Sequence, residues 1–169
     1  MEITWLLFLE KGIWLGLAAV GFGILFNVPI RTIWYIAVMG ALGGLTKAFI
    51  LSHGISVILA SFAGASVIGM LSVFAAHYKQ APAMVTAIPS VIPMVPGVFA
   101  YKAMIGFIEL AGNTTTADFS SILNETVNNG LKAFFILLSL AAGVGLPLLL
   151  TRKESTKELI KGIKDKSPN

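Results

Sequence analysis

The sequence predicts an all-α integral membrane protein with five transmembrane helices, the fourth of which is broken by a proline-rich segment. Of its 169 residues, 56% are hydrophobic and 12% are charged, about half the charged fraction that is usual in soluble domains. Apolar stretches of about 20 residues, long enough to cross a bilayer, recur along the chain. The absence of cysteine excludes disulfides and thiolate metal sites. No cofactor is expected, and the net charge of +4 does not suggest nucleic acid.

The expected spans are roughly Trp5 to Phe26, Thr32 to Leu51, Ile55 to His77, the proline-rich segment with its continuation to Gly112, and Leu131 to Leu150. Four apolar residues recur at helical spacing before the last span: Phe119, Ile122, Leu123 and Val127. This spacing predicts an amphipathic lead-in, separate from the last span or continuous with it. We assign residues 1–151 to a transmembrane domain and residues 152–169 to a basic tail, in which a capping-box pattern at 155–158 predicts a short helix.

The distribution of basic residues predicts the orientation in the membrane. Residues 152–169 hold six Lys or Arg and three acidic residues, and such an excess is typical of the cytoplasmic side. Five spans then place the N-terminus outside. The loops with Arg31 and Lys79 fall in the cytoplasm, and those with His53, Asp118 and Glu125 fall outside, so the assignment is consistent at every loop.

The proline-rich stretch from Pro82 to Lys102 is the most unusual part of the chain. It carries no charge from Gln80 through Tyr101, yet it holds four of the seven prolines, at positions 82, 89, 93 and 96. Proline removes a backbone donor and clashes with the preceding turn, so this segment is not expected to form an unbroken helix. Many transporters build a substrate site where a membrane helix is broken. The alternative is a kinked helix that only packs against its neighbours.

A half-helix that starts near Gly97 would offer a binding site for a carboxylate. The first N–H groups of a helix have no internal partner and lie at the positive end of the helix dipole, where anions bind. Pro93 and Pro96 would create the break, and Gly97 would allow close approach to the backbone. Tyr101 would add a hydroxyl one turn later, and Lys47 a long-range attraction. The alternative is that water or neighbouring side chains satisfy these donors.

The remaining polar residues give weaker signals. Asn27, Arg31, Lys102 and Glu109 are candidates for a gate or for structural polar contacts. The two histidines, at positions 53 and 77, fall on opposite faces of the predicted membrane domain and cannot form a metal pair. No catalytic motif is present, so the chain is not expected to be an enzyme.

Small residues recur at spacings of four along the first three predicted spans. The pairs are Gly12 and Gly16, Gly40 and Gly44, and Ala65 and Gly69. This spacing lets membrane helices approach closely. It predicts tight packing within the chain, or a docking face for a partner where the small residues point outward.

Three motifs resemble the threonine/serine exporter family. They are Asn27-Val28-Pro29-Ile30-Arg31, Gly40-Ala41-Leu42-Gly43-Gly44, and Val91-Ile92-Pro93-Met94-Val95-Pro96-Gly97-Val98-Phe99-Ala100-Tyr101 with Met104. The resemblance covers about residues 5–150 and is closest to the small, five-helix subunit of that family. It implies a bacterial inner-membrane exporter of small carboxylates, either amino acids such as threonine and serine or dicarboxylates such as succinate.

The resemblance also implies a partner. This would be a larger subunit with a soluble N-terminal domain and five further helices. Lys47 occupies a position where the family is expected to carry a basic residue, whereas Lys102 departs from the family pattern. Two other functions remain open: a scaffold or regulatory subunit, which would need no broken helix, and an oligomeric channel, which should carry a polar stripe along one helix.

Overall fold

The computed structural model describes residues 5–79, 82–112 and 116–165, which form six α-helices and one short 3-10 helix. These are α1 (Trp5–Leu25), α2 (Ile30–Ser52), α3 (Val57–Lys79), α4 (Ala83–Val91), η1 (Ile92–Met94), α5 (Gly97–Ala111) and α6 (Thr116–Asp165). No strand occurs within the described ranges. The predicted all-helical class is confirmed, and the bounds of the first three helices agree with the sequence to within about two residues.

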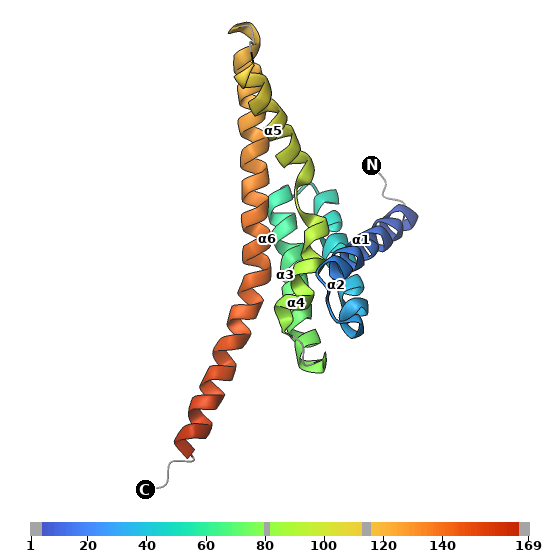
Figure 1. Cartoon of the computed structure of the whole chain (residues 1–169), viewed down its shortest axis with the longest axis vertical. Coiled ribbons are helices and arrows are strands. Elements are labelled where there is room, and N and C mark those ends of the chain that lie inside the picture. Colours follow the sequence, from blue (N-terminus) through green and yellow to red (C-terminus); the bar gives the residue numbers. More distant parts are fainter. Residues whose placement is uncertain (1–4, 80–81, 113–115, 166–169) are drawn as a thin grey trace.

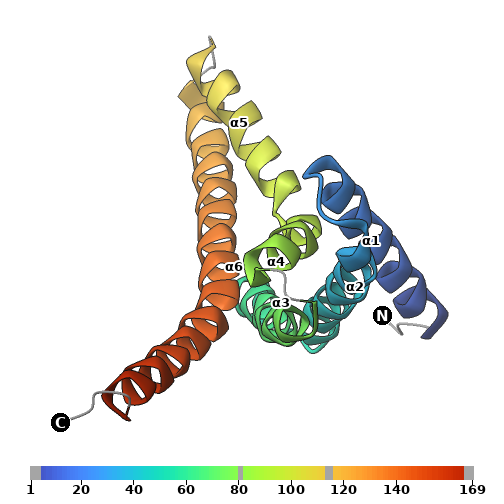
Figure 2. The ribbon, with the colours of Figure 1, turned by 60° about the horizontal axis from the view of Figure 1, so that its bottom comes forward.

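The helices form a bundle with a projecting hairpin (Figure 1). Helices α1 to α4 pack together, and α6 runs along the side of α3. Beyond the end of the bundle farthest from Asp165, the last residue of α6, α5 and the first part of α6 continue as an antiparallel pair (Figures 1 and 2). We call this pair, residues 97–111 and 116–135, the arm. In the arm, α5, which directly follows Pro96, extends away from the bundle.

Four helices are long and apolar enough to cross a membrane. The candidate spans are Leu6–Leu25, Ile30–Ser52, Val57–Ala76 and Phe119–Thr151. The pair formed by residues 83–94 and 97–111 is bent by 59° and raises the number to five if it counts as one span. The structure therefore gives a membrane protein with four to five apolar spans.

Helix α6 is one continuous helix of 50 residues. It includes the predicted lead-in, the predicted last span and the backbone of the tail as far as Asp165. At 1.5 Å per residue it is about 75 Å long, more than twice the ~30 Å of a hydrocarbon core. The lead-in is therefore continuous with the span, which was one of the two alternatives that the sequence left open.

The predicted small-residue pairs serve packing inside the chain. A Cβ on Gly40 of α2 would lie 2.5 Å from the Cβ of Ala19 on α1, and a Cβ on Gly16 would lie 3.0 Å from the oxygen of Ala37. On α3, Ala65 has its Cβ 2.7 Å from the position that a Cβ on Gly143 would take. These faces are already filled by neighbouring helices, so a partner would have to dock elsewhere.

The buried core lies where α3, α6 and the proline-rich segment meet. Its members are Ala65, Ile68, Ala87, Met94, Ile136, Leu140 and Val144. Met94 belongs to η1, the short turn between α4 and α5. The core therefore fixes the position of that turn against the bundle, while α5 leaves the bundle directly after it.

Candidate functional site

The chain changes direction between α4 and α5. Pro93 lies inside η1, and Pro96 is the residue that precedes α5, with φ −80° and ψ 57°. The Val95 N–H donates to the oxygen of Ile92 at 2.9 Å, which closes the 3-10 turn. Pro89, in contrast, lies inside α4 without ending it. Of the four prolines, Pro93 and Pro96 are thus the two that coincide with the bend, which we call the break (residues 92–97).

Lys47 reaches this break from α2. Its half-buried side chain places Nζ 3.0 Å from the main-chain oxygen of Met94, to which it donates a hydrogen bond. A cation is stabilised at the carbonyl end of a helical turn, where the partial charge is negative. The sequence analysis expected Lys47 to attract a carboxylate at the start of α5 from a distance. In the structure its ammonium contacts Met94, three positions before Gly97. An ammonium has three donors, and this bond uses one.

Gly64 of α3 makes room for this contact. A Cβ at Gly64 would lie 2.6 Å from the terminal carbon of Met94, 3.3 Å from the Cβ of Lys47 and 2.5 Å from the oxygen of Gly43. Helices α2 and α3 and the break therefore meet at one glycine. Sequence reasoning missed Gly64, because nothing in its local pattern shows which of the 17 glycines faces another element.

Ser61 lies one turn before Gly64, on the same side of α3. It is completely buried, and within the described part of the chain its hydroxyl has no hydrogen-bond partner. Other buried serines donate to their own helix, as Ser72 does to the oxygen of Gly69 at 2.7 Å. An unpaired buried hydroxyl costs about 1–3 kcal/mol. Ser61 was also missed by sequence reasoning, because serine is common in membrane helices.

The start of α5 is open. The Gly97 N–H donates to the oxygen of Val95 at 2.9 Å, and Ala100 N–H donates to Pro96 at 3.1 Å. Because no side chain caps this end, the N–H groups of Val98 and Phe99 are the donors that a helix start ordinarily leaves free. A Cβ on Gly97 would meet no atom within 4 Å. The space beside Gly97 is therefore open, and ligand access to the backbone there stays a prediction.

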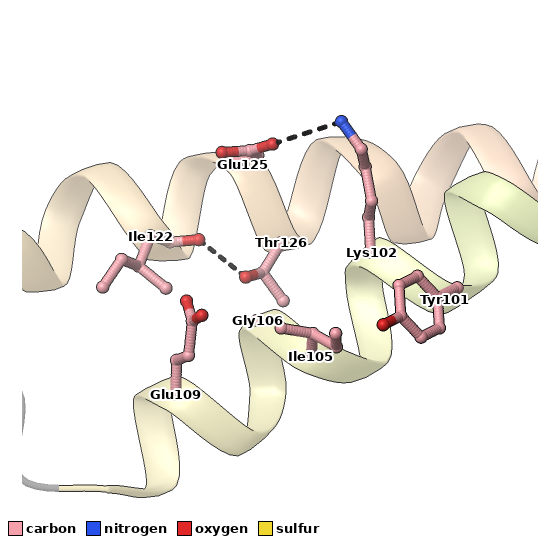
Figure 3. Close-up of a pocket in the computed structure, with 8 residues that line it drawn as sticks. All are labelled: Tyr101, Lys102, Ile105, Gly106, Glu109, Ile122, Glu125 and Thr126. Atoms are coloured by element: carbon pink, nitrogen blue, oxygen red, sulfur yellow. Dashed lines mark hydrogen bonds and ion pairs between the residues drawn. The ribbon is translucent and has the colours of Figure 1, made fainter.

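Three predicted residues lie in a groove between the two helices of the arm (Figure 3). Tyr101, Lys102 and Glu109 line it from α5, and Glu125 and Thr126 line it from α6. The cavity measures about 170 Å³. Lys102 Nζ lies 3.9 Å from Glu125 Oε1. Sequence reasoning missed Glu125 and Thr126 because the contact depends on how α5 folds back onto α6.

Asn27 and Arg31 lie apart from both the break and the groove. Asn27 has a positive φ of 54°, a conformation that asparagine tolerates, and its N–H donates to the oxygen of Ile24 at 2.9 Å. It forms the exposed turn between α1 and α2, and Arg31 is exposed at the start of α2. Whether they act as a gate or as structural polar residues stays a prediction.

Comparisons with known proteins identify the family of this chain. Residues 11–150 match the family described as "Threonine/Serine exporter, ThrE". An uncharacterised protein of Haemophilus influenzae is 35% identical over 133 residues, which cover 78% of this chain and 43% of that relative. The chain thus spans less than half the length of that relative, and no solved structure matches it. The four to five apolar spans and the family match together show a multi-pass membrane protein that belongs to the threonine/serine exporter family.

Proposed function

We propose that this chain is the small membrane subunit of a two-component exporter of small carboxylates. Its substrates would be amino acids of the threonine and serine type or dicarboxylates such as succinate. The bent pair of α4 and α5 would act as one broken span, with the substrate carboxylate held at the start of α5. The hydrogen bond from Lys47 to Met94 carries this proposal, because it brings a half-buried cation from α2 to the break.

Several groups at the break suit a carboxylate. The free N–H groups of Val98 and Phe99 would donate to its oxygens, as helix starts do for anions. The open space at Gly97 would let those oxygens reach the backbone. Lys47 has two further donors. The unpaired hydroxyl of Ser61 lies one turn from Gly64, where an added Cβ would meet both Lys47 and Met94. Tyr101, 65% exposed, would complete the site on its outer side.

A blocking substitution at Gly97 tests this site directly. Because nothing lies within 4 Å of a Cβ at Gly97, a valine fits there without displacing the fold but obstructs the backbone donors. We expect Gly97→Val to abolish export from cells that carry the assembled complex, and Tyr101→Phe to weaken it. Gly21→Val is the matched control, since a Cβ at Gly21 of α1 also meets nothing within 4 Å. Normal export by the Gly97→Val complex would refute the site.

The proline pair provides a second test. Pro93→Ala combined with Pro96→Ala should let α4 and α5 join as one helix, which would satisfy the donors of Val98 and Phe99 internally. Export should then fall while membrane insertion and assembly persist. Export at the normal rate would mean that the break is only a kink.

The family to which the chain belongs supports the two-component arrangement. More than half of the Haemophilus relative lies outside the match, so that protein has room for segments beyond the matched region. The partner would be a larger subunit with a soluble N-terminal domain and five further helices. We expect no export by this chain alone in liposomes and export on co-reconstitution with the partner. Full activity of the single chain would favour the oligomeric channel instead.

A scaffold or regulatory role is the other alternative. It would leave the break without a purpose beyond packing, and substitutions at Gly97 and Lys47 would then change assembly rather than the rate of export. Measuring assembly by co-purification alongside export therefore separates the two functions. The proposed location is the bacterial inner membrane.

A further inference from the structure

We propose that the groove between α5 and α6 is a second binding site, which takes a small zwitterionic amino acid. Its carboxylate would pair with Lys102, and its ammonium with Glu109 and Glu125. The site lies farther along α5 than the break and shares only Tyr101 with it. Its role in transport rests on the function proposed above, but its occupancy by a ligand does not.

The residues of the groove are arranged around a close approach of the two helices. Gly106 packs directly against Thr126, whose hydroxyl is tied back to the oxygen of Ile122 at 2.6 Å. Lys102 lies one turn before Gly106, and Glu109 lies one turn after it, so both side chains stand on the α5 face that meets α6. Figure 3 shows the carboxylate of Glu109 and the ammonium of Lys102 on the two sides of this contact. The groove thus has an apolar floor and charged ends.

The charges of the groove favour a zwitterion over a dicarboxylate. Two carboxylates, of Glu109 and Glu125, and one ammonium, of Lys102, line the groove. A dicarboxylate would pair one end with Lys102 and bring its other charge close to a carboxylate, which is unfavourable. An amino acid satisfies both signs at once. The cavity of about 170 Å³ is larger than the space that one water needs.

The existing ion pair in the groove is weak enough to be exchanged for a ligand. Lys102 Nζ and Glu125 Oε1 are 3.9 Å apart, and the two side chains are 56% and 72% exposed. Exposed pairs of this kind contribute little to stability. Glu109 has no ion pair within the described residues. A bound amino acid would give Glu109 a partner and would replace the long contact of Lys102 with a shorter one.

The groove lies farther along α5 than the break. Lys102 follows Gly97 by five residues on the same helix, a rise of about 7.5 Å. A substrate released at the start of α5 would meet Lys102 next and Glu109 farther along the arm. The groove would therefore select amino acids from the two substrate classes that the proposed function leaves open.

The test is a binding measurement by isothermal titration calorimetry on the purified full chain in nanodiscs, carrying Gly97→Val so that the carboxylate site proposed at the break is obstructed. The probes are L-serine, which carries both charges, L-lactate, which lacks the ammonium, ethanolamine, which lacks the carboxylate, and succinate. We expect binding of L-serine and at least about tenfold weaker binding of the other three. Lys102→Met and Glu109→Gln should each weaken L-serine binding about tenfold. Lys11→Met, an exposed charge removal on α1, should leave it unchanged.

Each alternative outcome has a definite meaning. The proposal is overturned if L-serine does not bind, if succinate or L-lactate binds equally well, or if neither groove variant weakens binding. Thermal unfolding of each variant shows that the fold is retained. A loss of L-serine binding in Lys47→Met alone would overturn the groove and leave the break site standing. A loss in the groove variants, with normal export by Lys47→Met and Gly97→Val, would overturn the break site and leave the groove.

Discussion

Lys47 donates a hydrogen bond to the main-chain oxygen of Met94, across 47 positions of sequence and at a distance of 3.0 Å. The bond joins the only lysine in α2 to the turn between α4 and α5. It satisfies a carbonyl that the end of a helical segment leaves without an internal partner. One charged side chain therefore links the break to α2, in addition to the packing of Met94 in the core.

Lys47→Met should lower export strongly while the complex still assembles. The variant keeps the length and apolar stem of the side chain but loses the charge, and the Met94 oxygen loses its donor, a cost of about 1–3 kcal/mol. We expect a lower Tm in detergent and at least tenfold slower export. Lys47→Arg, which keeps the charge, should retain part of the export rate. Export by Lys47→Met at the normal rate would show that the lysine has only a structural role.

Gly64→Ala should destabilise the junction of α2, α3 and the break. The added carbon would lie 2.5 Å from the oxygen of Gly43 and 2.6 Å from Met94 Cε, so the helices would have to separate. Overpacking of this kind costs about 1–3 kcal/mol. Thermal unfolding should give a lower Tm, whereas Gly21→Ala, with open space around its Cβ, should match or slightly exceed the parent protein. Equal Tm values for Gly64→Ala and the parent would contradict the close packing.

Ser61→Ala should lower the export rate without lowering the Tm. It removes a buried hydroxyl that has no partner in the described chain, so the Tm should stay the same or rise. If that hydroxyl serves the substrate at the break, export should fall about tenfold. Ser72→Ala is the control, because it removes a hydroxyl that is bonded to its own helix and should lower the Tm slightly with no effect on export. Unchanged export by Ser61→Ala would remove this serine from the site.

Reporter fusions test the orientation. A fluorescent protein fused after Asn169 should fluoresce, and alkaline phosphatase at the same point should be inactive, because the basic tail is expected in the cytoplasm. The reverse result would invert the topology and place the arm on the cytoplasmic side. Phosphatase fused at residue 113, between α5 and α6, should be active and serves as the complementary measurement.

The local features of this protein were determined by its sequence. The apolar stretches predicted the first three helices closely, because burial in a bilayer requires about 20 apolar residues whatever surrounds them. The bend falls at Pro93 and Pro96, because proline disrupts a helix through its own ring and its missing N–H. The family match over residues 11–150 confirms the resemblance that the motif around Pro96 and Gly97 had indicated.

The tertiary structure decided which residues meet. No local signal pairs Lys47 with Met94, Gly64 with Met94, or Lys102 with Glu125, since each contact joins separate helices. Helical periodicity also left open whether the lead-in at 119–127 was separate from the last span. The structure shows one helix from Thr116 to Asp165, along which α5 packs. Local sequence chemistry determines where the helices form. The close approach of backbones at Gly64 and Gly106 depends instead on how whole helices pack. The same packing brings Lys102 near Glu125.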